Sequence, residues 1–94
     1  MAVASYPRFE ELFGELVVLD LGSPFVYLGR LVELQGDYLV LAEADAHDLR
    51  DSATTREKYV LAARHHGVNA NRRWVWVSQR DVVGISRLAD VVGE

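Results

Sequence analysis

Short apolar runs, separated by polar or glycine-containing turns, predict five β-strands along the chain. The clearest pair is Phe25 to Leu34 and Tyr38 to about Ala44, two runs that flank the tripeptide Gln35-Gly36-Asp37. Two such runs around a short glycine-containing segment are typical of a β-hairpin. Gly29 lies inside the first run, where a glycine usually marks a bend or a close approach of two backbones. The pattern therefore predicts a bent hairpin around which the rest of the chain is organised.

Three further strands are predicted from the same kind of pattern. Leu16 to Leu21 is almost entirely apolar, which favours a strand that is buried on both faces or covered by a helix. Trp74 to Val77 and Val82 to Ile85 follow near the end of the chain, joined by the polar turn Ser78 to Asp81. The two tryptophans of the fourth strand are expected on one face and its two valines on the other. The acidic segment after Ala44 loses the apolar alternation, so we expect the third strand to end there.

Two helices are predicted. Pro7 to Phe13 places apolar residues at helical spacing and ends before Gly14, which suits a short N-terminal helix. A second helix is predicted from roughly Thr55 to His65, with Gly67 as its C-cap. Three hydroxyl residues are candidate N-caps of this second helix: Ser52, Thr54 and Thr55.

Composition narrows the class of protein. A chain of 94 residues fits one small domain, here residues 1–94. The absence of cysteine excludes disulfides and thiolate zinc sites and suits a reducing compartment. The N-terminal sequence lacks a signal-peptide pattern, and no apolar run approaches the roughly 20 residues of a membrane span. We therefore expect a cytoplasmic protein without membrane contact. The net charge of -4 argues against a whole-surface grip on nucleic acid and leaves only local basic patches.

The order and spacing of these segments resemble the Sm-like family, which includes the Sm, LSm and Hfq proteins. The resemblance covers about Phe9 to Ile85, without an insertion at about 46–73. Its first motif has three parts and its second has two: Val17–Leu19, Tyr27–Leu31 and Asp37–Leu41, then Val75–Val77 and Val82–Ile85. The resemblance implies a mainly β fold: a small, strongly bent, five-stranded SH3-like or Sm-like barrel. An N-terminal helix and a helical insertion between the third and fourth strands complete it.

The resemblance also implies a homo-oligomeric ring, in which the fourth strand of one copy pairs with the fifth strand of the next. The implied interface residues are Trp74, Val75, Trp76, Val77, Val82, Val83 and Ile85. Family members bind single-stranded RNA near the pore through two turns, which here contain Asp37 and Tyr38, and Gln79 and Arg80. Tyr38 is expected to stack on a base, and Arg80 to contact phosphate or stack. The chain departs from the family pattern at Leu41, where Sm proteins have an asparagine.

Arg72 and Arg73 form a second candidate basic patch beside the fourth strand, and a plain solvated loop is the alternative. No catalytic motif is present, and no cofactor or small-molecule substrate is expected. Metal binding is not expected either, because His65 and His66 are adjacent on the predicted helix and point about 100° apart. The leading function is a non-catalytic RNA-binding ring. The alternative is a homo-oligomeric scaffold or protein-interaction module of the same fold that binds no RNA.

Overall fold

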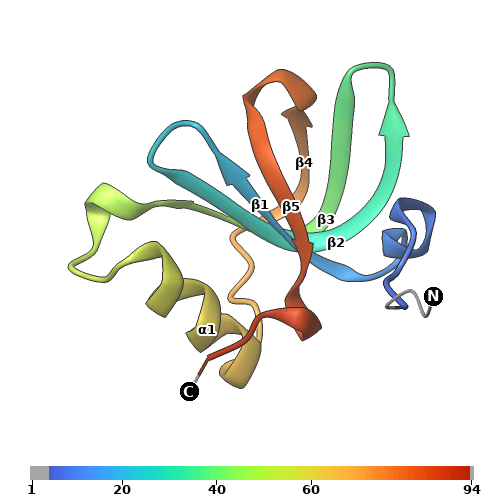
Figure 1. Ribbon diagram of the computed structural model, residues 1–94. Helices are drawn as coiled ribbons and strands as arrows, with labels where there is room; N and C mark the ends of the chain where they lie inside the picture. The colour runs from blue at the N-terminus through green and yellow to red at the C-terminus, as the bar shows by residue number, and fades with distance from the viewer. Residues whose placement is uncertain (1–4, 94) are drawn as a thin grey trace.

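The computed structural model describes residues 5–93 and contains a five-stranded antiparallel sheet with the strand order β4-β3-β2-β1-β5 (Figure 1). Its strands are β1 (Leu16–Leu21), β2 (Phe25–Gln35), β3 (Tyr38–Asp48), β4 (Arg72–Ser78) and β5 (Val82–Arg87). The helical elements are α1 (Arg56–His66) and the 3-10 turns η1 (Phe9–Leu12), η2 (Leu49–Asp51), η3 (Gln79–Asp81) and η4 (Leu88–Asp90). All five predicted strands and the helix between β3 and β4 are therefore present.

The bend in the central hairpin occurs at Gly29, as the sequence predicts. A Cβ atom built on Gly29 would lie 3.0 Å from both the Cα and the Cβ of Ala44 and 3.1 Å from the carbonyl oxygen of Ala42. The pairing register of β2 with β3 shifts between Leu28 and Arg30, on either side of this glycine. A side chain at this position would press against the backbone of the neighbouring strand β3, which accounts for the glycine.

The third strand is four residues longer than predicted, so the expected end at Ala44 is wrong. The strand continues to Asp48 and pairs with β2 along this whole extension. Asp45, the first acidic residue of this extension, is only 4% exposed and accepts hydrogen bonds from the Tyr59 hydroxyl and the Asn71 amide. An acidic side chain can lie inside a strand when distant residues satisfy its oxygens.

The N-terminal segment is a 3-10 turn of four residues, not the predicted helix Pro7 to Phe13. The amide of Gly14 donates to the carbonyl of Leu31 at 2.7 Å, with a left-handed φ of 89° at Gly14. This bond turns the chain into β1 before a second helical turn can form. Leu12 is buried in the core, so the segment still covers one end of the bent sheet.

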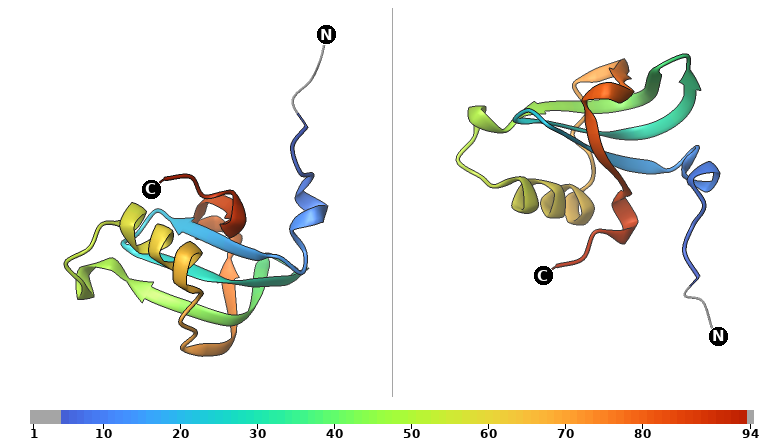
Figure 2. Two further views of the ribbon diagram at one scale, coloured as in Figure 1. Left: turned by 90° about the horizontal axis from the view of Figure 1, so that it is seen from below. Right: turned by 45° about the horizontal axis from the view of Figure 1, so that its top comes forward.

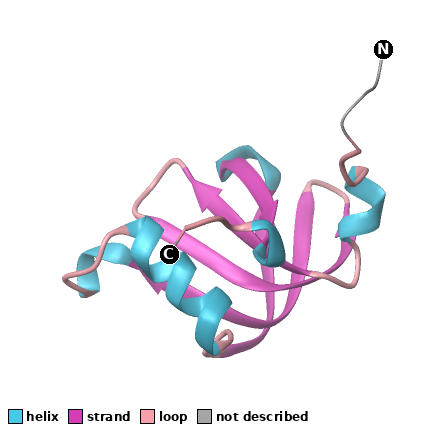
Figure 3. Ribbon diagram, turned by 60° about the horizontal axis from the view of Figure 1, so that its bottom comes forward, coloured by secondary structure: helices cyan, strands magenta, loops and turns pink. Residues whose placement is uncertain are grey.

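Helix α1 begins and ends within one residue of the prediction. Among the three candidate N-caps, Thr55 is the residue used, because its side chain accepts from the Lys58 amide at 3.2 Å. Gly67 ends the helix with a φ of 95°, as expected for a glycine C-cap. The helix and the C-terminal segment after β5 lie side by side against the sheet (Figures 2 and 3).

The two faces of the sheet carry separate cores. The core inside the bend comprises Leu12, Val17, Leu19, Leu31, Leu39, Leu41, Ala44 and Val77. The core on the outer face, beneath α1 and η4, comprises Val18, Val26, Leu28, Val60, Ala63 and Leu88. The prediction of a closed barrel is not confirmed, because β4 and β5 are the two ends of the sheet and do not pair with one another in the described residues.

Candidate nucleic-acid interface

The two turns that the family resemblance singles out lie next to one another. The amide of Gln79 donates to the carbonyl of Asp37 at 2.9 Å, and Tyr38 is the register partner of Ser78 at the end of β4. Because β3 and β4 are paired strands, their ends bring the β2–β3 turn and η3 together. The structure therefore places Asp37, Tyr38, Gln79 and Arg80 in one small surface, which we call the turn surface.

The turn surface is exposed and close to electrically neutral. Tyr38 is 47% exposed, and an exposed aromatic ring is the kind of side chain on which unstacked bases stack. Arg80 is exposed and forms no salt bridge in the part of the chain that the structure describes. The Asp37 carboxylate offsets that positive charge. The surface thus offers one aromatic platform and one cation rather than a basic groove.

Arg80 also lines an open hollow of about 400 Å³ that sequence reasoning missed. Its other walls come from the β1–β2 turn, around Ser23, and from Asp81 and Val83. The amide of Gly22 donates to the carbonyl of Asp81 at 3.1 Å and ties the two turns together. No local pattern marks this contact, because its two sides are about sixty residues apart in the sequence and meet only through the pairing of β1 with β5.

The second predicted patch, Arg72 and Arg73, lies at the opposite end of β4. Both residues are exposed and line an open hollow of about 450 Å³ beside Asn71. The seven residues of β4 separate this patch from Arg80 by roughly 20 Å, at about 3.3 Å per residue. The structure does not bring the two predicted RNA-contacting surfaces together. Asn71 itself is structural, since its amide group bonds both the amide and the carbonyl of Ala46.

The predicted interface strands lie at the two ends of the sheet. On β4, Trp74 and Trp76 are 49% and 51% exposed, whereas Val77 is buried, so the expected alternation of the two faces is observed. Trp76 donates its indole N–H to the side chain of Gln35 at 2.9 Å. On β5, Val83 is 73% exposed. The outer edge of each strand has no pairing partner within residues 5–93.

No protein family model matches the sequence, and no curated protein matches it. Solved structures do resemble it. The Sm protein of Pyrococcus abyssii, solved in complex with a uridine heptamer, is 19% identical with a TM-score of 0.56 over 83% of this chain and 89% of that chain. An Sm-like protein of Archaeoglobus fulgidus is 12% identical with a TM-score of 0.55 over 92% and 99%. A chain of the NatC complex bound to CoA is 16% identical with a TM-score of 0.53 over 87% and 86%.

The protein has the Sm-like fold. The family resemblance seen in the sequence is confirmed at this level by structures that align over most of the chain. TM-scores of 0.53–0.56 show a shared fold, although only 12–19% of the residues are identical. Within the described residues, no helix is long and apolar enough to cross a membrane.

In this Sm-like fold, a polar cluster joins the helical insertion to β3. The hydroxyl of Tyr59 on α1 donates to the buried Asp45 carboxylate. Burial, followed by the hydrogen bond and the negative charge of Asp45, raises the pKa of Tyr59. The His47 ring stacks on the Tyr59 ring with 3.9 Å between centroids and an angle of 6°. No group of three His, Cys, Asp or Glu side chains suited to a metal ion occurs in residues 5–93.

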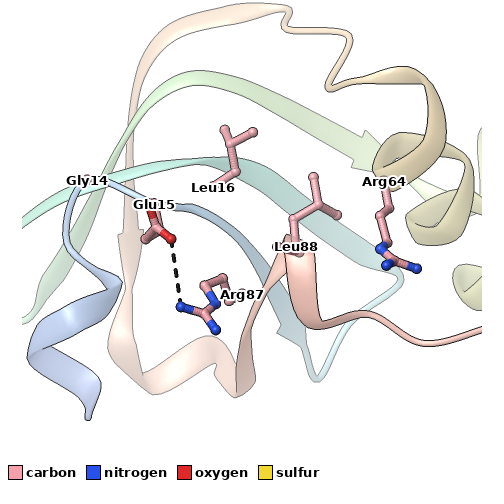
Figure 4. A pocket seen from close by; sticks show the side chains of 7 residues that line it. Gly14, Glu15, Leu16, Arg64, Arg87 and Leu88 are labelled. Carbon is pink, nitrogen blue, oxygen red and sulfur yellow. Dashed lines mark ion pairs between the residues drawn. The ribbon is translucent and has the colours of Figure 1, made fainter. Parts of the chain in front are cut away.

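A further hollow of about 330 Å³ lies between the start of β1, the end of α1 and η4 (Figure 4). Arg64 and Arg87 give it positive charge. The Arg87 guanidinium, however, lies 3.8 Å from a Glu15 carboxylate oxygen and 2.9 Å from one of Asp90. The hydrogen bond and the charge of Asp90 raise the pKa of Arg87. This arginine, the last residue of β5, is therefore already paired with carboxylates and links η4 to Glu15, the residue that precedes β1.

Proposed function

We propose that the protein is a non-catalytic, ring-forming Sm-like protein that binds single-stranded RNA at the turn surface. The observation that carries the proposal is the hydrogen bond from the Gln79 amide to the Asp37 carbonyl, which brings the exposed Tyr38 ring and the exposed Arg80 guanidinium together. Around a ring, this surface repeats once per copy. Each copy then contributes one stacking platform and one phosphate contact.

The proposed ring forms through strand addition between β4 of one copy and β5 of the next. Unpaired edges of this kind are covered in most proteins by charge, by a bulge or by another chain. Here the exposed edge strands carry Trp74, Trp76 and Val83, which are apolar. Pairing of the edges satisfies their backbone groups and covers part of this apolar surface.

The charge of the turn surface predicts a weak and base-stacking mode of RNA binding. With one arginine per copy and a nearby carboxylate, the salt dependence per subunit is small, with a log–log slope of about -0.7 for each phosphate contacted. Leu41 supplies no polar group at the position where the family resemblance leads us to expect an asparagine. Stacking on Tyr38 is therefore proposed to contribute more than base-edge hydrogen bonds.

The test is fluorescence anisotropy with short oligouridine and oligoadenosine RNAs. Tyr38→Ala and Arg80→Ala are each expected to weaken binding, because they remove the platform and the cation. Tyr6→Ala is the matched control for the tyrosine, since Tyr6 is 69% exposed outside the turn surface. Arg64→Ala is the control for the arginine, since Arg64 is exposed on α1 and belongs to neither predicted RNA-contacting patch. Equal affinity for all four variants contradicts RNA binding at the turn surface.

The alternative function is a homo-oligomeric scaffold of the same fold that binds protein and not RNA. The observations that favour it are the net charge of -4, the neutral turn surface and the fold shared with a chain of a protein complex, NatC. An assembled ring with no measurable RNA affinity at low salt supports the scaffold and contradicts the RNA proposal.

A further inference from the structure

We propose that Trp74 of one copy inserts into a groove between α1 and β5 of the next copy, which makes the helical insertion part of the subunit interface. The inference rests on the proposed ring and adds a specific contact to it. The observations that carry it are an exposed tryptophan on one edge strand, a matching groove beside the other, and a register that brings them together.

The groove has a volume of about 200 Å³ and lies on the outer face of the sheet. Its apolar walls are Val18 from β1, Val60 from α1 and Val91 from the C-terminal segment. Ser86 forms its β5 side, and Val92 stands at its mouth with 90% of its surface exposed. A groove with such walls, open to solvent, is suited to an aromatic side chain.

The faces of the two edge strands fix which residues meet. Val75 and Val77 of β4, like Ile85 of β5, pack against the core inside the bend. Gly84 and Ser86 lie on the other face, because they pair with Asp20 and the outer-core residue Val18. A continuous sheet keeps the inner faces together, since a slip of one residue would turn every side chain over. The two tryptophans of β4 must then lie on the same face as Gly84 and Ser86.

Strand overlap selects one register among those that keep the faces matched. Pairing Trp74 with Ser86 and Trp76 with Gly84 aligns residues 84–87 of β5 with residues 73–76 of β4. The β-bulge at Val83, seen where Asp20 pairs with Gly84 and Leu21 with Val82, then brings Val82 opposite Val77, and both pack against the core inside the bend. A slip of two residues in either direction leaves part of β5 without a partner in β4. In the full-overlap register, each tryptophan faces a residue with a very small side chain or none. Trp74 is the one that faces Ser86 and hence the groove.

The polar groups at the groove also suit an indole ring. Trp76 already donates its N–H to Gln35, whereas the N–H of Trp74 makes no hydrogen bond within residues 5–93. Asp20, Arg56 and Glu57 also line the groove, and the Asp20 carboxylate already accepts from the Arg56 guanidinium at 3.3 Å. The Glu57 carboxylate makes no hydrogen bond within residues 5–93 and provides the acceptor for that N–H. A partner aromatic ring with one donor therefore matches the groove in size, apolar character and hydrogen bonding.

The experiment uses the full chain and two single-tryptophan variants, Trp76→Phe and Trp74→Phe. Light scattering gives the mass over a dilution series, and acrylamide quenching of fluorescence gives the exposure of the remaining tryptophan. In the Trp76→Phe variant, quenching of Trp74 is expected to fall several-fold as the copies assemble. Assembly with Trp74 quenched as freely as in the diluted monomer overturns the inference and leaves the ring intact. A monomer at every concentration overturns the ring itself and this inference with it.

A surface substitution tests the groove without disturbing the core. Val92→Glu places a carboxylate at the mouth of the groove, and a buried unpaired polar group is expected to weaken association roughly 10-fold to 100-fold. Leu34→Glu makes the same kind of change at a 43% exposed position on the β2–β3 hairpin and is expected to leave the mass unchanged. Equal effects of the two variants, or no effect of Val92→Glu on assembly, overturn the proposal.

Discussion

Replacing Tyr59 by phenylalanine removes one hydroxyl group from the contact that holds α1 against β3. Asp45 is 4% exposed and loses its Tyr59 donor, and only the Asn71 amide at 3.3 Å remains among its side-chain donors. A hydrogen bond to a charged group contributes about 1.5–3 kcal/mol, and we take the lower part of that range because Tyr59 is only partly buried. A loss of about 1.5–2 kcal/mol lowers the Tm of a domain of this size by roughly 6–16 °C.

The same substitution changes the response to alkaline pH. The folded-state pKa of Tyr59 is raised, so its neutral hydroxyl stabilises the fold fully below the unfolded pKa of about 10, and this contribution is lost as pH rises further. The wild type is therefore expected to lose stability through Tyr59 as pH rises above about 10 toward the raised folded pKa, and Tyr59→Phe is expected to depend less on pH there.

The assay is urea unfolding followed by circular dichroism at pH 7 and at alkaline pH. Tyr6→Phe serves as the matched control, because Tyr6 is 69% exposed. The reasoning is refuted if Tyr59→Phe leaves the urea midpoint at pH 7 unchanged. It is also refuted if the variant and the wild type lose the same free energy of unfolding between pH 7 and alkaline pH.

Three further predictions concern the backbone and one acidic residue. Gly29→Ala should destabilise the fold by about 1–3 kcal/mol, because the new methyl group would lie 3.0 Å from the Ala44 Cα of β3. Urea unfolding measures this loss, and a change smaller than the error of the method would contradict the close approach. Gly67→Ala should cost about 1 kcal/mol, since φ is 95° there, with Gly22→Ala, whose φ is not in the left-handed region, as the comparison. Hydrogen bonds from the Arg50 side chain and amide lower the pKa of Asp48 to about 2, so its contribution is present above about pH 4 and is lost as pH falls toward 2. Arg50→Ala should raise that pKa in an NMR titration, and an unchanged value would rule out the side-chain contact.

Most of the fold could be predicted from the sequence, because the deciding interactions are local. The bent hairpin follows from one turn and from Gly29, and α1 follows from a threonine cap and Gly67. The extension of β3 could not be predicted. It depends on Tyr59 and Asn71, which reach Asp45 from elements 14 and 26 residues away. The N-terminal helix was mispredicted for a similar reason, since the bond from Gly14 to Leu31 overrides the helical spacing.

The candidate site was predicted only in part. Residue pattern alone gave no reason to connect Tyr38 with Arg80; the family resemblance did, and the pairing of β3 with β4 brings them together. The hollow beside Arg80 and the groove beneath α1 escaped prediction, because each is formed by strands whose pairing is not encoded in any local pattern. Such sites depend on β1 pairing with β5 across most of the chain length.

Assembly has stronger physical support than RNA binding in this chain, and this sets the order of the experiments. The two sheet edges have no pairing partner within residues 5–93 and carry exposed apolar side chains, which favours association whether or not RNA is present. The turn surface, in contrast, carries one arginine beside one carboxylate on a protein of net charge -4. A single weak contact per copy becomes useful only when a ring repeats it, because linked sites raise the effective concentration of RNA at each neighbour. If the full chain assembles, RNA affinity should therefore fall sharply in Val92→Glu, although that residue lies outside the turn surface. Unchanged RNA affinity in a dissociated variant would show that binding does not require the ring.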